Sequence, residues 1–264
     1  MEMKSYGHGV PSWVDVGCRD TVAAAAFYNA LFGWDVQPGP PEAGGYAVAH
    51  LRGKSVAGLG PIPDPATPPF WLTYVNVDSA DEIVEKVTAN GGHMFVPPMD
   101  VLDFGRMAVF ADPMGAVLGA WQPGSHIGAE LINEPNTLCW SELLTSDVEA
   151  SKAFYGAVFG WGAVPQSHSD DVPEAMAYTE WELGGVSIGG LMLKPPFLSS
   201  EEPSHWVVYF AVDDTDAAVA KATSLGARAT VPPTDIEPGR FAVIEDPGGA
   251  SFSVITLKPE LTES

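Results

Sequence analysis

Basic residues are scarce in this sequence. Its 264 residues include 12 Lys and Arg against 34 Asp and Glu, which gives a formal net charge of −22. A surface this acidic repels polyanions, so neither nucleic acid nor an anionic membrane is expected as a partner. Solubility is a sufficient explanation of the charge, and we infer no cationic substrate from the composition alone.

Cysteines and long apolar runs are also scarce. The two cysteines, Cys18 and Cys139, are too few for a disulfide framework or a zinc ribbon, and we expect buried free thiols. No run of 18 or more apolar residues is present, so no membrane-spanning helix is expected. The N-terminal residues lack the apolar core of a signal peptide, which favours a cytoplasmic location.

An internal repeat organises the chain. The segment WVDVGCRDTVAAAAFYNALFGW (13–34) recurs as WSELLTSDVEASKAFYGAVFGW (140–161), and further matches follow at offsets that grow from 127 to 135 residues. The growth falls in loops, where length changes are tolerated. Because the period is too long for a solenoid, we predict two homologous domains, 9–122 and 136–257, joined by a linker at 123–135.

Each predicted domain contains the same order of elements twice. A short apolar strand is followed by a capping residue, a helix with apolar residues at helical spacing, and a glycine at the helix end. The predicted helix caps are Asp20, Asp78, Asp147 and Asp213. Further strands follow each helix, so the chain is predicted to be an α+β protein made of four βαβββ units.

These motifs resemble those of the vicinal oxygen chelate superfamily, which contains glyoxalases, bleomycin-resistance proteins and extradiol dioxygenases. FYxxxFGW, a VDDxDA-type helix start and DPxGA occur in this order twice within residues 9–257. The chain resembles in particular the two-domain actinobacterial branch that includes a mycobacterial culture-filtrate antigen. The resemblance implies two tandem glyoxalase-like domains with mixed sheets that cup a ligand.

The resemblance also implies where a metal would bind, because metal-dependent members place His and Glu at fixed strand positions. The six corresponding positions hold Trp13, Leu72, Gly119, Trp140, Val207 and Ser253. None is His, Asp or Glu, whereas a divalent site needs three or four such ligands. We therefore predict no metal site of the usual kind and no cofactor.

Strand alternation places other side chains in the cavities. If Trp13 and Trp140 point inward, then Asp15 and Glu142 point inward as well. The other predicted ligand-binding residues are Tyr74, Trp121, Tyr209 and His205, the last at the start of a cavity strand.

The inward carboxylates have two interpretations. In the structural one, Trp13 and Trp140 fill the sheets, and Asp15 and Glu142 accept hydrogen bonds or pair with the arginines of the two Gly-Arg motifs, Arg106 and Arg240. Some partner is required, since a buried unpaired carboxylate is costly. In the functional one, a partly buried carboxylate with a raised pKa acts as a general base.

Three functions follow from these interpretations. The first is binding or sequestration of a small, partly aromatic molecule without a metal, as in the bleomycin-resistance branch. The second is a glyoxalase-like lyase or isomerase, or a hydroxylase, with Glu142 or Asp15 as the base. The third is a scaffold whose cavities are filled by side chains. We expect a small molecule as the partner, and a monomer or weak homodimer as the assembly.

Overall fold

The computed structural model describes residues 1–166, 178–195 and 202–258. The first sheet contains β1 (Pro11–Cys18), β2 (Asp35–Pro38), β3 (Ala47–Leu51), β4 (Lys54–Pro61), β5 (Phe70–Asn76), β6 (His93–Val101), β7 (Gly105–Ala111) and β8 (Val117–Pro123). The second contains β9 (Leu138–Thr145), β10 (Gly162–Pro165), β11 (Thr179–Leu183), β12 (Val186–Leu193), β13 (His205–Ala211), β14 (Arg228–Ile236), β15 (Gly239–Glu245) and β16 (Ser251–Leu257). The helices are α1 (Thr21–Phe32), α2 (Ala80–Ala89), α3 (Val148–Phe159) and α4 (Thr215–Ser224), with a short 3-10 helix η1 (Pro41–Ala43).

The two sheets have the same topology. Their strand orders are β2-β3-β4-β1-β5-β8-β7-β6 and β10-β11-β12-β9-β13-β16-β15-β14. In each, the central strand (β1 or β9) pairs in parallel with one neighbour and antiparallel with the other, which joins two βαβββ units into one curved mixed sheet. The predicted α+β fold of four βαβββ units in two tandem domains is confirmed.

Helices α1 and α3 begin and end at the predicted residues. Asp20 and Asp147 are the N-caps, and each accepts hydrogen bonds from backbone N–H groups of the first helical turn. Gly33 and Gly160 end these helices with φ angles of 75° and 77°, which side chains with a Cβ rarely adopt. Among the described residues, no helix is both long and apolar enough to span a bilayer.

The predicted caps of α2 and α4 are wrong by one residue. The N-caps are Ser79 and Asp214 rather than Asp78 and Asp213. Ser79 accepts a hydrogen bond from the backbone N–H of the third helical residue, and Asp214 does the same in α4. Two adjacent residues at each place are good caps, and only the helix register decides which of them is used.

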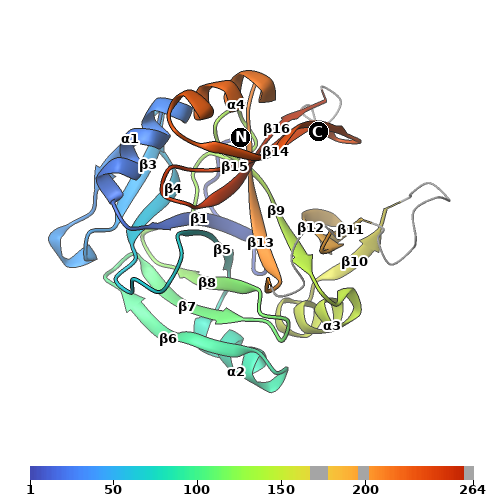
Figure 1. Cartoon of the computed structure of the whole chain (residues 1–264). Helices are drawn as coiled ribbons and strands as arrows, with labels where there is room; N and C mark the ends of the chain where they lie inside the picture. The colour runs from blue at the N-terminus through green and yellow to red at the C-terminus, as the bar shows by residue number, and fades with distance from the viewer. Residues whose placement is uncertain (167–177, 196–201, 259–264) are drawn as a thin grey trace.

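The two domains share their hydrophobic cores. Helix α1 of the first domain packs beside α4 of the second, and α2 packs beside α3 (Figure 1). On the first of these faces, Phe32 of α1 lies with its ring centroid 5.3 Å from that of Phe210 on β13. On the other, Phe159 of α3 lies 6.4 Å from Phe110 on β7. Because each interface buries aromatic rings from both domains, the two domains form one continuous structure.

The tyrosine of the repeated Phe-Tyr motif forms a hydrogen bond across this interface. The hydroxyl of Tyr28 donates to Asp246 Oδ2 over 2.8 Å, and that of Tyr155 donates to Asp112 Oδ2 over 3.0 Å. Each aspartate belongs to the Asp-Pro-x-Gly turn of the opposite domain. The duplication therefore preserves a pair of buried hydrogen bonds that join the domains across an approximate twofold relation.

The repeated Phe-Gly-Trp motif also crosses between the domains. The indole Nε1 of Trp34 donates to the backbone carbonyl of Asn136 over 2.8 Å. The indole of Trp161 donates to the carbonyl of Gly9 over 2.7 Å. Each buried indole N–H thus has a backbone acceptor just before the first strand of the other domain, as a buried donor requires.

Candidate functional site

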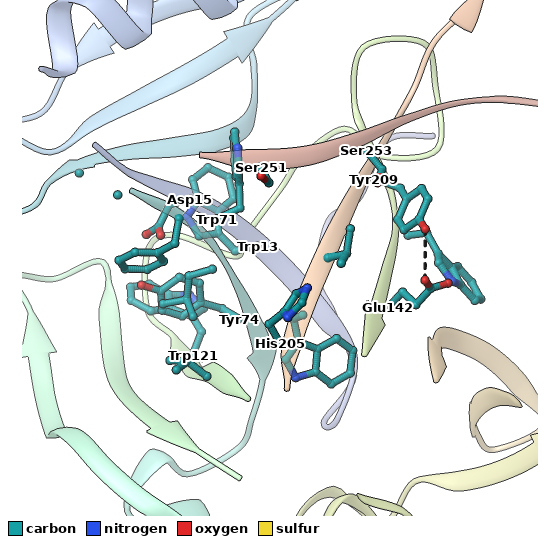
Figure 2. Close-up of a pocket in the computed structure, with 18 of the residues that line it drawn as sticks. Trp13, Asp15, Trp71, Tyr74, Trp121, Glu142, His205, Tyr209, Ser251 and Ser253 are labelled. Atoms are coloured by element: carbon teal, nitrogen blue, oxygen red, sulfur yellow. Dashed lines mark hydrogen bonds between the residues drawn. The ribbon is translucent and has the colours of Figure 1, made fainter. Parts of the chain in front are cut away.

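The predicted site residues lie on the concave faces of the two sheets (Figure 2). Trp13 and Asp15 come from β1, with Tyr74 opposite on β5, while Glu142 and Tyr209 occupy the related places on β9 and β13. The two faces join in one open depression with a volume of about 3740 Å3. A single ligand pocket is roughly 300–1,000 Å3, so the depression contains room for more than one binding place.

In the first domain, four side chains form a connected group. The Trp13 indole Nε1 donates to the Tyr46 hydroxyl over 2.9 Å, and that hydroxyl donates to Asp15 Oδ2 over 3.0 Å. The hydroxyl of Tyr74 also hydrogen-bonds Asp15. We call Trp13, Asp15, Tyr46 and Tyr74 the first acid–aromatic cluster.

The second domain contains the same arrangement. The Trp140 indole Nε1 donates to the Tyr178 hydroxyl over 2.8 Å, and the Tyr209 hydroxyl donates to Glu142 Oε1 over 3.2 Å. Tyr178 also hydrogen-bonds Glu142. We call Trp140, Glu142, Tyr178 and Tyr209 the second acid–aromatic cluster. Each cluster thus surrounds one carboxylate with two phenols and one indole.

The low polarity of the clusters changes the acidity of their carboxyl groups. Burial raises the pKa of Asp15 to about 6, although hydrogen bonds from Tyr46 and Tyr74 act in the opposite direction. The Asp15 side chain keeps some exposed area on the cavity wall, but protein atoms surround its carboxylate. Burial also raises the pKa of Glu142, again against the hydrogen bonds from its two tyrosines. Each carboxyl group therefore holds its proton at a higher pH than an exposed carboxyl group of the same kind would.

Two glycines make room for the clusters. Gly58 on β4 lies beside Asp15, and a Cβ there would be 1.9 Å from the hydroxyl oxygen of Tyr46. Gly190 on β12 lies beside Glu142, and a Cβ there would be 2.0 Å from the hydroxyl oxygen of Tyr178. A larger residue at either position would displace a tyrosine, so the clusters depend on close approach to bare backbone.

Tyr46 and Tyr178 were not among the predicted site residues. Each lies just before a strand, where strand alternation gives no direction for its side chain. A signal was present, however. Both tyrosines open the repeated segments YAVAHLRGKSVAGL and YTEWELGGVSIGGL, and the tyrosine and the glycine thirteenth in these segments recur together.

The arginine partners considered for the buried carboxylates are wrong. Arg106 pairs with Asp81 and Asp100, and Arg240 pairs with Asp216 and Asp235. These ion pairs tie the helix and the hairpin of the second half of each domain together at the surface. In the described residues, neither Asp15 nor Glu142 takes part in an ion pair, and the partners that satisfy them are phenol hydroxyls.

The positions that correspond to the superfamily's metal ligands do not fit a divalent ion. They hold two indoles, two aliphatic side chains, a glycine and a serine, namely Trp13, Trp140, Leu72, Val207, Gly119 and Ser253. A Cβ at Gly119 would be 2.1 Å from Cδ1 of Tyr74, so this ring occupies the space that a ligand side chain would need. In residues 1–166, 178–195 and 202–258, no group of three or more His, Cys, Asp or Glu could hold a metal ion.

The linker covers the first cluster. The His126 ring meets the Trp13 ring edge-on with centroids 4.5 Å apart, and its backbone carbonyl accepts a hydrogen bond from the Trp121 indole over 2.9 Å. Ala129 is fully buried against the same rings, and its N–H donates to Ser12 O over 2.8 Å. Burial lowers the pKa of His126 to about 4, so its ring is neutral. Trp13 is consequently only 4% exposed.

The two remaining predicted residues have different surroundings. Trp121 lies inward on β8, but the linker holds it through the bond to His126. His205 opens β13 and lines the depression, with Nδ1 3.1 Å from the carbonyl of Pro203 and 3.7 Å from Glu202 Oε1. Figure 2 shows His205 between the two groups of site residues and apart from the hydrogen bond of Glu142.

The thiols lie outside the clusters' hydrogen bonds. Cys18 is buried, and Cys139 is partly exposed; both are free. Burial raises the pKa of Cys18 to about 11 and that of Cys139 to about 12. Both thiols are therefore protonated at neutral pH and poorly suited to act as nucleophiles.

The fold and the paired concave sites define a protein of the glyoxalase class. The chain belongs to the Glyoxalase/Bleomycin resistance protein/Dioxygenase superfamily, whose family model matches residues 11–119 and 136–254. The family resemblance predicted from the sequence is confirmed.

Two curated relatives match this chain over nearly the whole length of both proteins. A Mycobacterium tuberculosis (strain CDC 1551 / Oshkosh) protein named "Putative glyoxylase CFP32" is 44% identical over 262 residues, which cover 97% of each chain. The "Anthracycline biosynthesis protein DnrV" of Streptomyces peucetius is 36% identical over 271 residues, covering 97% of this chain and 96% of that one.

Solved structures share the arrangement of both domains. The Mn(II)-bound glyoxalase from Novosphingobium aromaticivorans aligns with a TM-score of 0.64 at 17% identity, over 96% of this chain and 84% of that one. The 2,3-dioxygenase LapB from Pseudomonas sp. KL28 aligns with a TM-score of 0.64 at 15% identity, over 96% of each chain. At such low identity the likeness shows the common fold and carries no information about the reaction.

Proposed function

We propose that this protein binds a small, partly aromatic molecule in the cavity of its second domain, without a metal at the superfamily's usual ligand positions. The second acid–aromatic cluster carries the proposal, because it combines the partly exposed indole of Trp140 with a buried carboxylate and two phenols. Aromatic walls with a few placed polar groups are typical of small-molecule sites.

The choice of the second domain rests on access. In the first domain, the linker packs on Trp13, so this indole is only 4% exposed. Among the described residues, by contrast, no aromatic ring stacks on Trp140 or meets it edge-on, and Trp140 is partly exposed. An aromatic ligand would therefore find an available indole in the second cavity.

One relative supports the aromatic character of the ligand. The Streptomyces protein is named for anthracycline biosynthesis, and anthracyclines contain fused aromatic rings. A planar ring of this kind suits the walls formed by Trp140, Tyr178 and Tyr209, since offset stacking and edge contacts add about 0.5–1.5 kcal/mol beyond buried area.

Titration with 1,8-dihydroxyanthraquinone, a neutral fused-ring probe, tests the proposal. We expect one saturable site per chain, seen by dye absorbance and tryptophan fluorescence, that persists in EDTA. Trp140→Leu should weaken binding about tenfold, the equivalent of roughly 1.4 kcal/mol. The matched variant Trp13→Leu should leave dye affinity unchanged, because its cluster is covered.

Three results would contradict this proposal. They are the lack of saturable binding, an equal loss of affinity in the two tryptophan variants, and dependence of binding on a stoichiometric divalent metal. Metal content of the purified protein is measured alongside, since one equivalent of Ni, Zn, Mn or Fe per domain would overturn the metal-independent part of the proposal.

The raised pKa values of Asp15 and Glu142 favour a second candidate, a lyase or isomerase that removes a proton next to a carbonyl group. A carboxylate whose pKa approaches the working pH is an effective general base, and burial moves both Asp15 and Glu142 in that direction. The test is exchange of the α-protons of 2-hydroxyacetophenone into D2O, followed by NMR. Enzyme activity predicts exchange that Glu142→Gln or Asp15→Asn slows by at least about a hundredfold. Exchange no faster than in buffer would exclude proton transfer to this probe.

A further inference from the structure

We infer that the ligand of the second-domain cavity carries a protonated amine or quaternary ammonium group, bound by Glu142 within the aromatic side chains of Trp140, Tyr178 and Tyr209. The inference rests on the proposed binding function and specifies the chemical class of its ligand.

Among the residues that the structure describes, none supplies a positive charge to Glu142. Its side chain is only 7% exposed, and its hydrogen-bond donors are the neutral hydroxyls of Tyr178 and Tyr209. The sequence offered Arg240 as a possible partner of the buried carboxylate. In the structure, two aspartates hold Arg240 at the surface instead. A buried carboxylate without a cation is an electrostatically incomplete site, and a cationic ligand group would complete it.

Aromatic side chains surround the Glu142 carboxylate. A cation is attracted to the faces of Trp and Tyr rings, and several such rings together recognise ammonium groups. Here the indole N–H of Trp140 is directed to Tyr178, and the hydroxyls of Tyr178 and Tyr209 are directed to Glu142. These hydrogen bonds hold the three rings around the carboxylate and leave its negative charge as the dominant feature of the cluster.

The charged residues that line the depression are mainly acidic. In the part of the chain that the structure describes, its Lys and Arg lining residues are Lys4, Lys54 and Lys258. The acidic lining residues are Glu2, Asp15, Glu42, Asp64, Asp100, Glu130, Glu134, Glu142, Glu180, Glu202 and Glu237. A concave surface with an excess of one sign of charge concentrates ions of the opposite sign, so this acidic surface attracts a cationic ligand and disfavours an anionic one.

The first cluster provides an internal control. Asp15 has the same kind of neutral partners, Tyr46 and Tyr74, so its carboxylate poses the same electrostatic problem. The linker residue His126 packs on Trp13, however, and covers the indole that a cation would contact in the first cluster. A cation should therefore depend on Glu142 and not on Asp15.

Binding of three matched probes tests the inference. Benzyltrimethylammonium is a permanent cation, neopentylbenzene is its neutral isostere, and phenylacetate is an anion with the same ring. By calorimetry or ligand-observed NMR at low salt, we expect the cation to bind about tenfold or more tightly than neopentylbenzene, with phenylacetate weakest. Added salt should reduce the preference.

Substitutions in the two clusters show which side chain causes the preference for the cation. Glu142→Gln should bring the cation's affinity down to that of the neutral isostere, whereas Asp15→Asn should leave it unchanged. Trp140→Leu retains the carboxylate and should still weaken the cation severalfold. Circular dichroism and urea unfolding establish that each variant is folded, and Glu142→Asp, which retains the charge, replaces Glu142→Gln if the latter fails to fold. Glu142→Asp is then expected to keep the preference.

The outcomes separate the inference from the proposed function. Equal or tighter binding of neopentylbenzene or phenylacetate, or a preference that survives Glu142→Gln, would overturn the inference. If 1,8-dihydroxyanthraquinone binds but benzyltrimethylammonium does not, the inference fails and the proposed function stands. If none of the four probes binds, both fail.

Discussion

The first and second domains build the same acid–aromatic cluster on related strands but enclose it differently. In the first, the segment that follows β8 returns over the sheet and places His126 and Ala129 against Trp13. In the second, Trp140 has the same hydrogen bond to a tyrosine but keeps part of its surface exposed. The residues of the cluster are therefore duplicated with the sheet, whereas the contact that buries Trp13 comes from the linker that follows β8.

The contacts between the domains show the opposite behaviour. Tyr28 and Tyr155 make equivalent bonds to the aspartates of the facing turns, and the aromatic cores around them are arranged alike. Evolutionary divergence between two copies is restricted at a shared core, because a change on one side leaves a buried partner on the other without its bond. The domains thus differ at their cavities and agree at their interface.

Filling the space behind the second cluster should have the largest effect on binding. In Gly190→Val, the added side chain would displace the Tyr178 hydroxyl and crowd Trp140, whose Nε1 is 2.9 Å from the ideal Cβ. We expect the affinity for 1,8-dihydroxyanthraquinone to fall by about a hundredfold or more, equal to at least roughly 2.7 kcal/mol. The matched Gly58→Val should lose similar stability, about 1–3 kcal/mol, but retain dye binding. Equal binding losses in the two variants would remove the distinction between the cavities.

The pH dependence of the unfolding free energy should reveal the raised pKa of Asp15. The pKa of Asp15 is raised from 3.8 to about 6 in the folded protein, so the folded state holds this proton more tightly than the unfolded state. Its contribution to stability is complete below pH 3.8 and is lost as the pH rises through about 6, with a total of about 3 kcal/mol.

Urea unfolding of the protein and of Asp15→Asn between pH 4 and 7.5 measures this contribution. We expect the difference in unfolding free energy between them to change by about 2.4 kcal/mol over that range, in favour of the parent at low pH. Glu142→Gln should show a change of the same sign. A difference that does not vary with pH would mean that Asp15 titrates normally.

Removing the interdomain hydroxyls should have equal effects on the two halves. Tyr28→Phe removes the donor to Oδ2 of Asp246, and Tyr155→Phe removes the donor to Oδ2 of Asp112, at an expected cost of about 2 kcal/mol each. Thermal and urea unfolding compare the two variants. Costs that differ by more than about 1 kcal/mol would show that the interfaces are not equivalent in energy.

His126→Ala should open the first cavity and have the smallest effect on stability. We expect a loss of about 1 kcal/mol, because the ring contacts of His126 are removed. The variant uncovers Trp13 and makes the first domain resemble the second. We expect a second, weaker dye site, seen as an increase in stoichiometry from one towards two. Unchanged stoichiometry with unchanged tryptophan fluorescence would mean that other linker residues close the cavity by themselves.

Most of the fold was predictable because its signals are local. The helix stops at Gly33 and Gly160 and the alternation that directs Asp15 and Glu142 inward depend on residues a few positions apart, and the repeat is visible by direct comparison of the two halves. Predictions that needed a choice between neighbours were less accurate, as with Asp78 and Ser79 at the start of α2. The partners of the carboxylates could not be predicted, because alternation gives a side chain's face but not what lies opposite it.

The sequence by itself determined the duplication, the four βαβββ units, the family and the indole and carboxylate at the centre of each concave sheet. Short-range periodicity is sufficient for the four units and for the direction of these side chains, whereas the duplication follows from the repeated segments and the family from the resemblance of its motifs. Only the tertiary structure decided which helices meet across the domains, which tyrosines reach the carboxylates, and which of the two cavities the linker covers. These features depend on contacts between residues far apart in the chain, whose approach is set by packing of the whole molecule.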